Sequence, residues 1–314
     1  MRLSVKLLLF LFFITFLNYS SMAEIRFLGK DTLDLRGTFR FLEGSSYFDT
    51  NGDDVLELLM EGQEGEDDPL TSVFTINKYT LDIKADYYLT DKLILSGQVP
   101  FSLITYKEEK DSLLPYQDIN TSDTVWVRER FPGYDASLFQ ADFYQLGAKY
   151  VFYQRRAYAA VAADFRLPGS FSNYERDTSN KELEYGSTTE LLIGLIIGAR
   201  FGESYVESSF SYNKRSGDFS DQMQINIEGA FSAEKGTQLR FRTLFIMNND
   251  PLKDAIPMDP RKPTFSEEML MLGATLRLAI SGNFYTDIGY QKVLYGKNTW
   301  NVGEFVLTAG FLLK

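Results

Sequence analysis

Charged side chains recur at every second position in many stretches of the sequence, with apolar residues between them. In 32–41, Asp34, Arg36 and Arg40 alternate with leucine, glycine and phenylalanine. Successive side chains of a β-strand point to opposite faces, so such a stretch carries charge on one face and hydrocarbon on the other. Charges gathered on one face of a sheet indicate either an aqueous path or a set of ion pairs.

The same alternation assigns nine acidic and nine basic residues to one common face. We expect this face to line the interior of a β-barrel, and its residues are Asp34, Arg36, Arg40, Asp82, Lys84, Asp86, Lys149, Asp164, Arg166, Glu190, Arg200, Glu207, Glu228, Arg240, Arg242, Arg277, Asp287 and Glu304. They either line a selective lumen or pair across the interior and fill it. The near balance of charge favours pairing, because buried charges are costly unless they are paired.

Four of these residues are candidates for a patch that attracts anions. Arg240 and Arg242 lie two positions apart on one strand and therefore share a face. Arg36 and Arg40 likewise share one face of the first strand. Whether the four side chains meet depends on how the strands are arranged in the barrel.

Catalytic chemistry is restricted by two absences in the composition. The chain has no histidine and no cysteine, which excludes histidine acid–base catalysis, histidine metal sites, thiolate chemistry and disulfides. Asp82 and Asp86 share a strand face, but acids on barrel strands are more often solvated or paired. We therefore predict that the protein is not an enzyme and uses no cofactor.

An acidic segment begins like a calcium-binding loop. Asp49, Asn51 and Asp53 have the spacing of the first three ligands, but Asp54 stands where the loop needs glycine and Met60 where it needs a bidentate glutamate. We predict a solvated acidic loop and no metal site.

The stretch 188–207 shows most clearly which element carries these patterns. Leucine, isoleucine, alanine and phenylalanine occupy alternate positions from Leu191 to Phe201, and Gly202 and Glu203 then turn the chain back. The apolar run is shorter than the about 20 residues of a membrane-spanning helix, but it suits a membrane-spanning strand of about 9 to 11 residues.

The connections between such strands alternate in length. The turns at 89–92, 154–156, 202–203, 234–236 and 281–283 are short, and most of the others are long and polar. Transmembrane barrels have short periplasmic turns, long outer loops and an even number of strands. We therefore predict an all-β fold, a single transmembrane antiparallel β-barrel of about twelve strands, with both ends of the barrel chain on the periplasmic side. Barrels of about eight strands are filled and those of about 16 to 18 are open, so this size permits either interior.

Aromatic residues make up 15% of the chain, as expected for girdles at the two membrane interfaces. The girdle candidates near strand ends are Tyr79, Tyr87, Tyr88, Tyr150, Phe152, Tyr153, Tyr205, Tyr212, Tyr285 and Trp300. Girdles are the more common role of such residues, and a stacking track for an aromatic substrate is the alternative.

The N-terminus predicts export. Arg2 and Lys6 precede an apolar core at 7–17, and Ser21-Met22-Ala23 offers small residues before a cleavage site. We expect 1–23 to be a cleaved signal peptide and 24–314 to be the barrel.

Composition also bounds the partners. The net charge of −11 argues against nucleic-acid binding, which usually shows a basic patch. The barrel prediction implies outer-membrane lipid and the barrel-assembly machinery as partners, the bacterial outer membrane as location, and a small solute of unknown identity.

Several short motifs resemble one family of outer-membrane barrels. The sequence YLTDKL at 88–93 with VPF at 99–101, LGAKY at 146–150, FRLPG at 165–169 and YNKRSGDFSD at 212–221 are similar to segments of the transporter family of the phenol-degradation meta-pathway type. The resemblance implies a barrel that moves small, hydrophobic compounds, and it carries over no catalytic residues.

We therefore predict passage of a small hydrophobic or aromatic solute across the outer membrane. The alternative is a non-transporting barrel, plugged by its own side chains, with a structural or surface-interaction role through the loops at 49–70, 107–140 and 248–265.

Overall fold

The structure is a computed structural model of the 314-residue chain. It describes residues 28–49, 51–55, 58–59, 71–117, 124–169, 171–174, 188–217, 219–234, 236–249 and 267–314. The predicted signal peptide lies outside the described residues and stays a prediction. Within the described residues, no helix is both long and apolar enough to cross a membrane.

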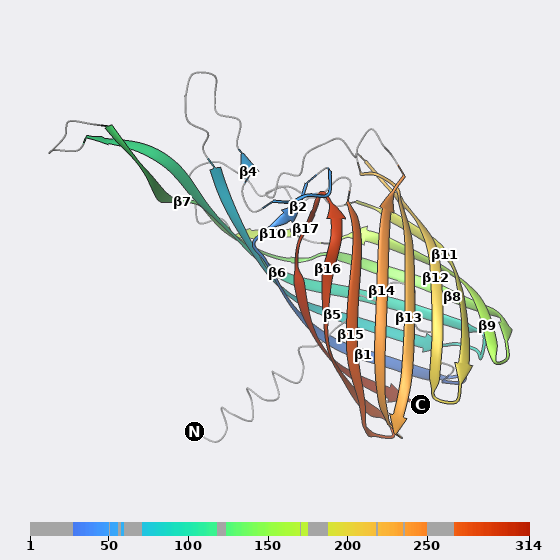
Figure 1. Ribbon diagram of the computed structural model, residues 1–314. Helices are drawn as coiled ribbons and strands as arrows, with labels where there is room; N and C mark the ends of the chain where they lie inside the picture. The colour runs from blue at the N-terminus through green and yellow to red at the C-terminus, as the bar shows by residue number, and fades with distance from the viewer. Residues whose placement is uncertain are drawn as a thin grey trace.

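Fourteen strands form the wall of one closed barrel (Figure 1). They are β1 (Thr32–Gly44), β5 (Thr71–Tyr88), β6 (Leu93–Gln117), β7 (Thr124–Ala141), β8 (Phe143–Gln154), β9 (Ala157–Pro168), β10 (Phe171–Tyr174), β11 (Glu190–Phe201), β12 (Ser204–Arg215), β13 (Gln222–Glu234), β14 (Thr237–Asn248), β15 (Glu268–Ser281), β16 (Phe284–Lys297) and β18 (Gly303–Leu313). β7 and β8 are two parts of one wall strand, as are β9 and β10, so the wall has twelve strands.

Antiparallel pairing of β1 with β18 closes the barrel, with Leu33 opposite Leu313. The prediction of a single antiparallel barrel of about twelve strands is confirmed.

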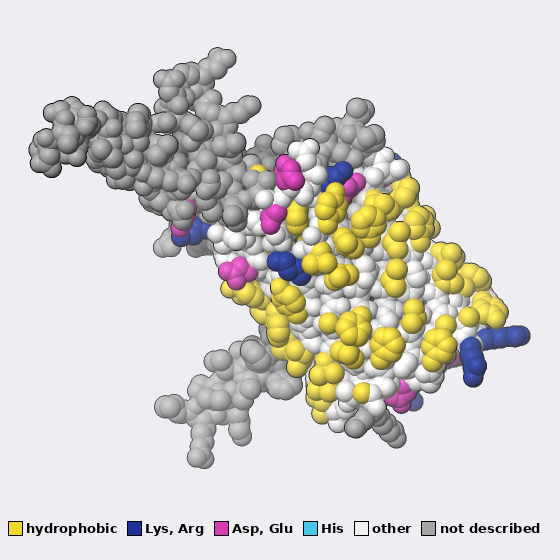
Figure 2. All heavy atoms as spheres, in the orientation of Figure 1, with side chains coloured by type: hydrophobic (Ala, Val, Ile, Leu, Met, Phe, Trp, Pro, Cys, Tyr) yellow, Lys and Arg dark blue, Asp and Glu magenta, His cyan; other side chains and the backbone are white. Residues whose placement is uncertain are grey.

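The alternation of side chains separates the two faces of the wall. In β11, Ile193 and Ile197 are more than half exposed, whereas their neighbours Leu192 and Ile196 are completely buried. Apolar side chains spread over the middle of the outer surface in Figure 2. No second sheet covers these residues in the described part of the chain, so the belt of hydrocarbon faces lipid.

The predicted short turns all lie at one end of the barrel, which we call the short-turn end. Gly202 has a φ of +69° in the turn between β11 and β12, a conformation that glycine adopts without steric cost. The start of β1 lies at the same end, because Thr32 pairs with Tyr88 just before the first short turn. The end of β18 also lies there, opposite Leu33. We call the opposite end the long-loop end.

A β-bulge interrupts the wall beside Pro100. Between the pairs Gln98–Gln145 and Phe101–Ala141, the wall strand made of β7 and β8 contains one residue more than β6 does. Proline cannot donate a ladder hydrogen bond, and here its carbonyl accepts the amide of Asp142 at 2.8 Å. A proline inside a strand favours such a bulge, because it removes one donor from the ladder.

The region 107–140, which we expected to be a polar loop, forms mostly strand. β6 and β7 continue to pair as a hairpin that projects beyond the barrel in Figure 1. The expectation was wrong because a two-stranded hairpin outside the membrane can be solvated on both faces, so its sequence lacks the alternation of a membrane strand.

A small sheet of β2 (Tyr47–Phe48), β3 (Asp54–Val55) and β17 (Thr299–Trp300) forms part of the long-loop end. One more short strand, β4 (Leu58–Leu59), pairs with β5.

The carboxylate of Asp49 organises the turn that precedes β3. Its Oδ1 accepts the backbone amides of Asn51 at 2.8 Å and Asp53 at 2.9 Å, an arrangement typical of an Asx turn. Met60 lies outside the described residues, and the described ones contain no group of three acidic ligands that could hold a metal.

Two tyrosines on the inner face occupy positions opposite glycines of the next strand. Tyr158 of β9 pairs with Gly198 of β11, and Tyr285 of β16 pairs with Gly310 of β18. A methyl group built on either glycine would overlap the tyrosine ring. Both tyrosines are 5% exposed or less, so Tyr285 lies inside the barrel and the prediction that it joins a girdle was wrong.

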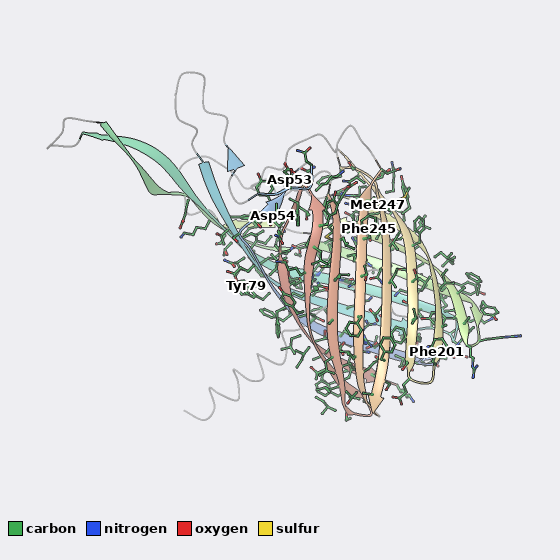
Figure 3. All side chains as sticks on the ribbon, viewed as in Figure 1. Asp53, Asp54, Tyr79, Phe201, Phe245 and Met247 are labelled. Carbon is green, nitrogen blue, oxygen red and sulfur yellow. The ribbon has the colours of Figure 1, made fainter. Side chains whose placement is uncertain are left out.

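Figure 3 shows Tyr79 and Phe201 on the outer side of the wall, where they are 40% and 66% exposed. Tyr79 thus agrees with the predicted girdle, and so does Tyr87, which is 37% exposed.

Candidate functional site

The structure buries most of the eighteen charged residues that the sequence assigned to the interior. Fourteen are exposed by less than a tenth: Asp34, Arg36, Arg40, Asp82, Lys84, Asp86, Lys149, Asp164, Arg166, Glu207, Glu228, Arg240, Asp287 and Glu304. The other four are half-buried: Glu190, Arg200, Arg242 and Arg277. That these residues line the path of a solute stays a prediction.

Arg36 forms ion pairs with two aspartates of the interior. Its Nε lies 3.2 Å from Asp34 Oδ2, and its Nη2 donates to Asp86 Oδ2. The hydroxyl of Tyr285 donates to Asp34 at 3.0 Å, and Lys84 Nζ lies 3.8 Å from Asp86. Because these groups are almost completely buried, they are stabilised by one another rather than by water.

Arg40 lies between two carboxylates on neighbouring strands. Its guanidinium nitrogens are 3.3 Å from Glu304 on β18 and 3.6 Å from Asp82 on β5. Gln98 Nε2 donates to Asp82 at 2.9 Å, and Gln291 donates to Glu304. Asp82 has no exposed surface, so this cluster fills the interior at its level.

Two glutamates face each other across β12 and β13 on the other side of the barrel. Glu207 pairs in register with Glu228. Tyr158 donates to Glu207 at 2.5 Å, and Tyr205 donates to Glu228. The guanidinium of Arg240 lies 6.0 Å from the centre of the Tyr205 ring. The tyrosine hydroxyls thus satisfy two carboxylates that repel each other.

The remaining arginines of the interior are also engaged. Arg277 makes two hydrogen bonds of 2.5 Å to Asp287, and its guanidinium lies 4.2 Å from the centre of the Tyr285 ring. Arg242 Nε donates to Asn226 Oδ1 at 2.6 Å. Of the two interpretations of the charged face, the structure therefore shows paired and packed side chains through the middle of the barrel.

A cavity of about 380 Å³ lies above these charges, at the long-loop end. Arg40 and Glu304 form part of its lining, so the ion-paired cluster borders the cavity on the side of the short-turn end. Its volume falls in the range of small-molecule sites.

Apolar side chains line the part of the cavity formed by β14, β15, β16, β17, the residue before β18, β1 and β5. They are Leu42, Ile76, Leu244, Ile246, Met269, Met271, Val293, Trp300 and Val302. Trp300, expected in a girdle, thus belongs to the cavity. Several of these residues pack in one cluster with Phe48, Ile104 and Tyr106.

The opposite part of the cavity, formed by β9, β11, β12 and β13, is polar. Its residues are Arg166, Glu190, Asn213, Arg215, Gln222 and Gln224. The cavity is therefore amphipathic. Its aliphatic side chains lie on one side, together with Arg40, Lys78, Arg242, Gln291 and Glu304, and the other side carries mainly charged and amide groups beside Phe143 and Phe219.

Asp221 holds the connection between β12 and β13 beside this polar wall. Its carboxylate accepts Lys214 Nζ at 2.7 Å, the Tyr212 hydroxyl at 2.6 Å and the amide of Arg215 at 3.0 Å. Partial burial raises the pKa of Asp221, but these hydrogen bonds outweigh it and lower the pKa to about 2. The acid is ionised at every physiological pH.

Only part of the predicted anion-attracting patch assembles. Arg40 and Arg242 both line the cavity, whereas Arg36 and Arg240 do not. Arg215 and the apolar side chains of the cavity were not among the predicted site residues. The alternation of side chains along a strand could have identified the apolar residues. Leu42 follows Arg40 by two residues and Leu244 follows Arg242 by two, so each leucine shares the inner face with its arginine.

A closed barrel with an apolar belt outside and paired charges inside defines an outer-membrane β-barrel, and the bacterial outer membrane is where this protein resides. Its fold is similar to that of the COG4313 outer membrane channel from Pseudomonas putida F1, with a TM-score of 0.55, 14% identity and coverage of 94% of this chain and 98% of that one.

Weaker likenesses extend to other barrels. They include the TodX deltaS2S3 mutant monoaromatic hydrocarbon channel, with a TM-score of 0.46, 9% identity and 91% coverage of both chains. The translocator domain of the autotransporter NalP from Neisseria meningitidis has a TM-score of 0.42, 7% identity and coverage of 89% and 88%. Neither bears on function. No family model and no curated protein matches the sequence.

Proposed function

We propose that the barrel takes a small amphipathic solute into the cavity at the long-loop end and passes it across the outer membrane. The observation that carries this proposal is the cavity itself, about 380 Å³ in volume and lined by both aliphatic and charged side chains, inside a closed membrane barrel. A filled structural barrel has no need of such a space, because tight packing stabilises an interior better than a void does.

The ion pairs beneath the cavity set the mode of passage. Asp34 and Asp82 have no exposed surface, and Lys84 is 1% exposed. A solute that leaves the cavity toward the short-turn end must displace these side chains. We therefore expect slow, selective passage rather than the steady ion current of an open pore.

A second apolar cluster supports this route. Tyr88, Ile94, Val151, Tyr158 and Ile196 pack in one cluster inside the barrel toward the short-turn end. The interior thus offers an apolar surface on each side of the charged middle, and a solute with an apolar body would find hydrocarbon contacts before and after the barrier.

The second candidate is a non-transporting barrel with a role at the cell surface. Complete burial of the central ion pairs favours it, and so does the β6–β7 hairpin, which projects beyond the barrel (Figure 1). Under this alternative the cavity would bind a solute without releasing it on the other side. We propose no catalytic activity for either candidate.

Uptake by Gram-negative cells separates the two candidates. Cells expressing the protein would be given labelled 3-phenylpropanoate, 3-phenylpropanol or 3-phenylpropylamine, three probes with the same apolar body and different charge. Transport predicts faster uptake of at least one probe than in cells without the protein. Equal uptake of all three would support the plugged barrel.

Two substitutions on β15 provide the matched variants. Met271→Trp fills the cavity, and Leu272→Trp adds the same ring to the outer face, where Leu272 is 43% exposed. We expect Met271→Trp to reduce uptake to the background rate and Leu272→Trp to retain it. Heat-modifiable migration in electrophoresis would show that both variants fold.

A further inference from the structure

We propose that the solute of this cavity is an amphipathic monoanion, a carboxylate on an aromatic or hydrocarbon body, whose carboxylate lies between Arg166 and Arg215. This inference rests on the proposed function and names the class of solute. It follows from the charges of the polar wall and from the position of the apolar wall.

Three charged residues form one row across the polar wall. Arg166 of β9 pairs in register with Glu190 of β11, and Glu190 pairs with Arg215 of β12. Arg166 Nη1 donates to Glu190 Oε2 at 2.9 Å, whereas Arg215 Nε lies 3.7 Å from Glu190 Oε1. One carboxylate therefore serves two guanidiniums, and the row carries one net positive charge.

Arg215 makes fewer hydrogen bonds than Arg166 through its guanidinium. Its Nε is buried and has no hydrogen-bond partner, and its Nη1 donates only to the carbonyl of Ser220 at 3.3 Å. Glu190 meanwhile accepts Asn213 Nδ2 at 3.0 Å in addition to Arg166. Glu267 and Asp221 also attract Arg215 electrostatically, but neither accepts a hydrogen bond from its guanidinium in the described part of the chain. A solute carboxylate would supply this missing acceptor.

Aromatic rings hold both guanidiniums in place. The ring of Phe143 lies 4.7 Å from Arg166, and the ring of Phe219 lies 4.6 Å from Arg215. Stacking covers one face of each planar group and reduces the entropy lost when its edge binds a carboxylate.

The acids of the cavity are already occupied, which weakens the case for a cationic solute. Asp142 accepts Lys78 Nζ at 2.9 Å, Ser102 Oγ at 2.7 Å and Gln140 Nε2 at 2.9 Å. Glu267 accepts Thr299 Oγ1 at 2.8 Å.

The cavity lining contains five cationic side chains, Arg40, Lys78, Arg166, Arg215 and Arg242, and four carboxylates, Asp142, Glu190, Glu267 and Glu304. Asp82, which lies 3.6 Å from Arg40 just outside the lining, balances the fifth cation. The preference for an anion therefore rests on the row of Arg166, Glu190 and Arg215 and not on an excess of charge.

The body of the solute would lie against the opposite wall. Trp300, Met269 and Met271 lie across the cavity from the arginine row. Tryptophan and methionine accept rings and chains of varied shape. One observation favours a different head group: Asn213 Oδ1 is a buried acceptor without a partner, and a cationic probe tests whether it selects the solute.

Binding to the refolded protein in detergent tests the inference directly. Trp300 fluorescence, in a Trp126→Phe background, would report the binding of 3-phenylpropanoate, 3-phenylpropanol and 3-phenylpropylamine. A charge-assisted contact predicts that the anion binds about tenfold more tightly than the alcohol. An alcohol that binds as tightly as the anion, or an amine that binds most tightly, would overturn the inference.

Variants locate the carboxylate. We expect Arg215→Gln or Arg166→Gln to bring the affinities of anion and alcohol within about twofold, while Arg155→Gln, an exposed site at the short-turn end, preserves the preference. A preference that survives both cavity substitutions would also overturn the inference. The wild-type comparison decides the matter even if a variant does not fold. Selective binding without uptake would refute the proposed function alone.

Discussion

Replacing Arg40 separates the stabilising role of the central ion pairs from their role in closing the cavity. Arg40→Ala removes a cation that lies 3.3 Å from Glu304 and 3.6 Å from Asp82. Both carboxylates then stay buried with one amide partner each, Gln291 and Gln98. Removing one member of a buried charge group costs about 3 to 5 kcal/mol, and the two remaining amides place our expectation near the lower value.

Arg40→Met is the matched control, because it keeps most of the side-chain volume and removes the charge. Denaturant titration of the refolded barrel, followed by tryptophan fluorescence, would measure the free energy of unfolding. We expect a loss of about 3 kcal/mol for both variants. In planar bilayers, only Arg40→Ala is expected to increase ion conductance, since it alone opens the bottom of the cavity.

Two results would refute this reasoning. Unfolding free energies within about 0.5 kcal/mol of the wild type would show that the cluster around Arg40 contributes little stability. A wild-type conductance equal to that of Arg40→Ala would show that the charged middle does not close the interior.

Two further predictions concern the connection at Asp221 and the tyrosine–glycine contacts. Folding lowers the pKa of Asp221 to about 2, so the ionised carboxylate contributes about 1 kcal/mol of stability above its ordinary pKa, and this contribution is lost as the pH falls toward 2. The free energy of unfolding, measured from neutral pH to pH 2, should therefore differ between wild type and Asp221→Asn at neutral pH and become equal in acid. A difference that stays constant with pH would contradict this prediction. Gly198→Ala should destabilise the barrel by about 1 to 3 kcal/mol, because the added methyl overlaps the ring of Tyr158; Gly97→Ala, whose methyl would meet Leu146 at 3.9 Å, should be neutral, and equal unfolding midpoints would count against the argument.

Strand alternation was enough to predict the wall of the barrel. The faces of β1 and β11, the short turns and the bulge at Pro100 follow from local rules, because each depends on residues close together in the sequence. The β6–β7 hairpin was missed because its sequence lacks the alternation of a membrane strand.

The site was less accessible to sequence reasoning. Parity says that Arg40 and Arg166 face inward, but it does not say how deep each lies or which residue meets it. Depth depends on the stagger of strands around the whole barrel, and this stagger brings Arg166 to Glu190 while separating Arg36 from Arg242. Attention to charge alone also hid Leu42 and Leu244, which share the inner face.

The two tyrosine–glycine pairs have a consequence for how the barrel is assembled. A slip of two residues between β16 and β18 preserves the inward and outward faces, so hydrophobicity alone does not reject it. Such a slip would move Tyr285 from Gly310 to Thr308 or Leu312, where a side chain occupies the place of the ring. Tyr158 and Gly198 impose the same restriction on β9 and β11. Each pair therefore permits only one register between its two strands. The pair of Tyr285 and Gly310 lies next to the β18–β1 pairing, where the first and last strands must pair in register to close the barrel.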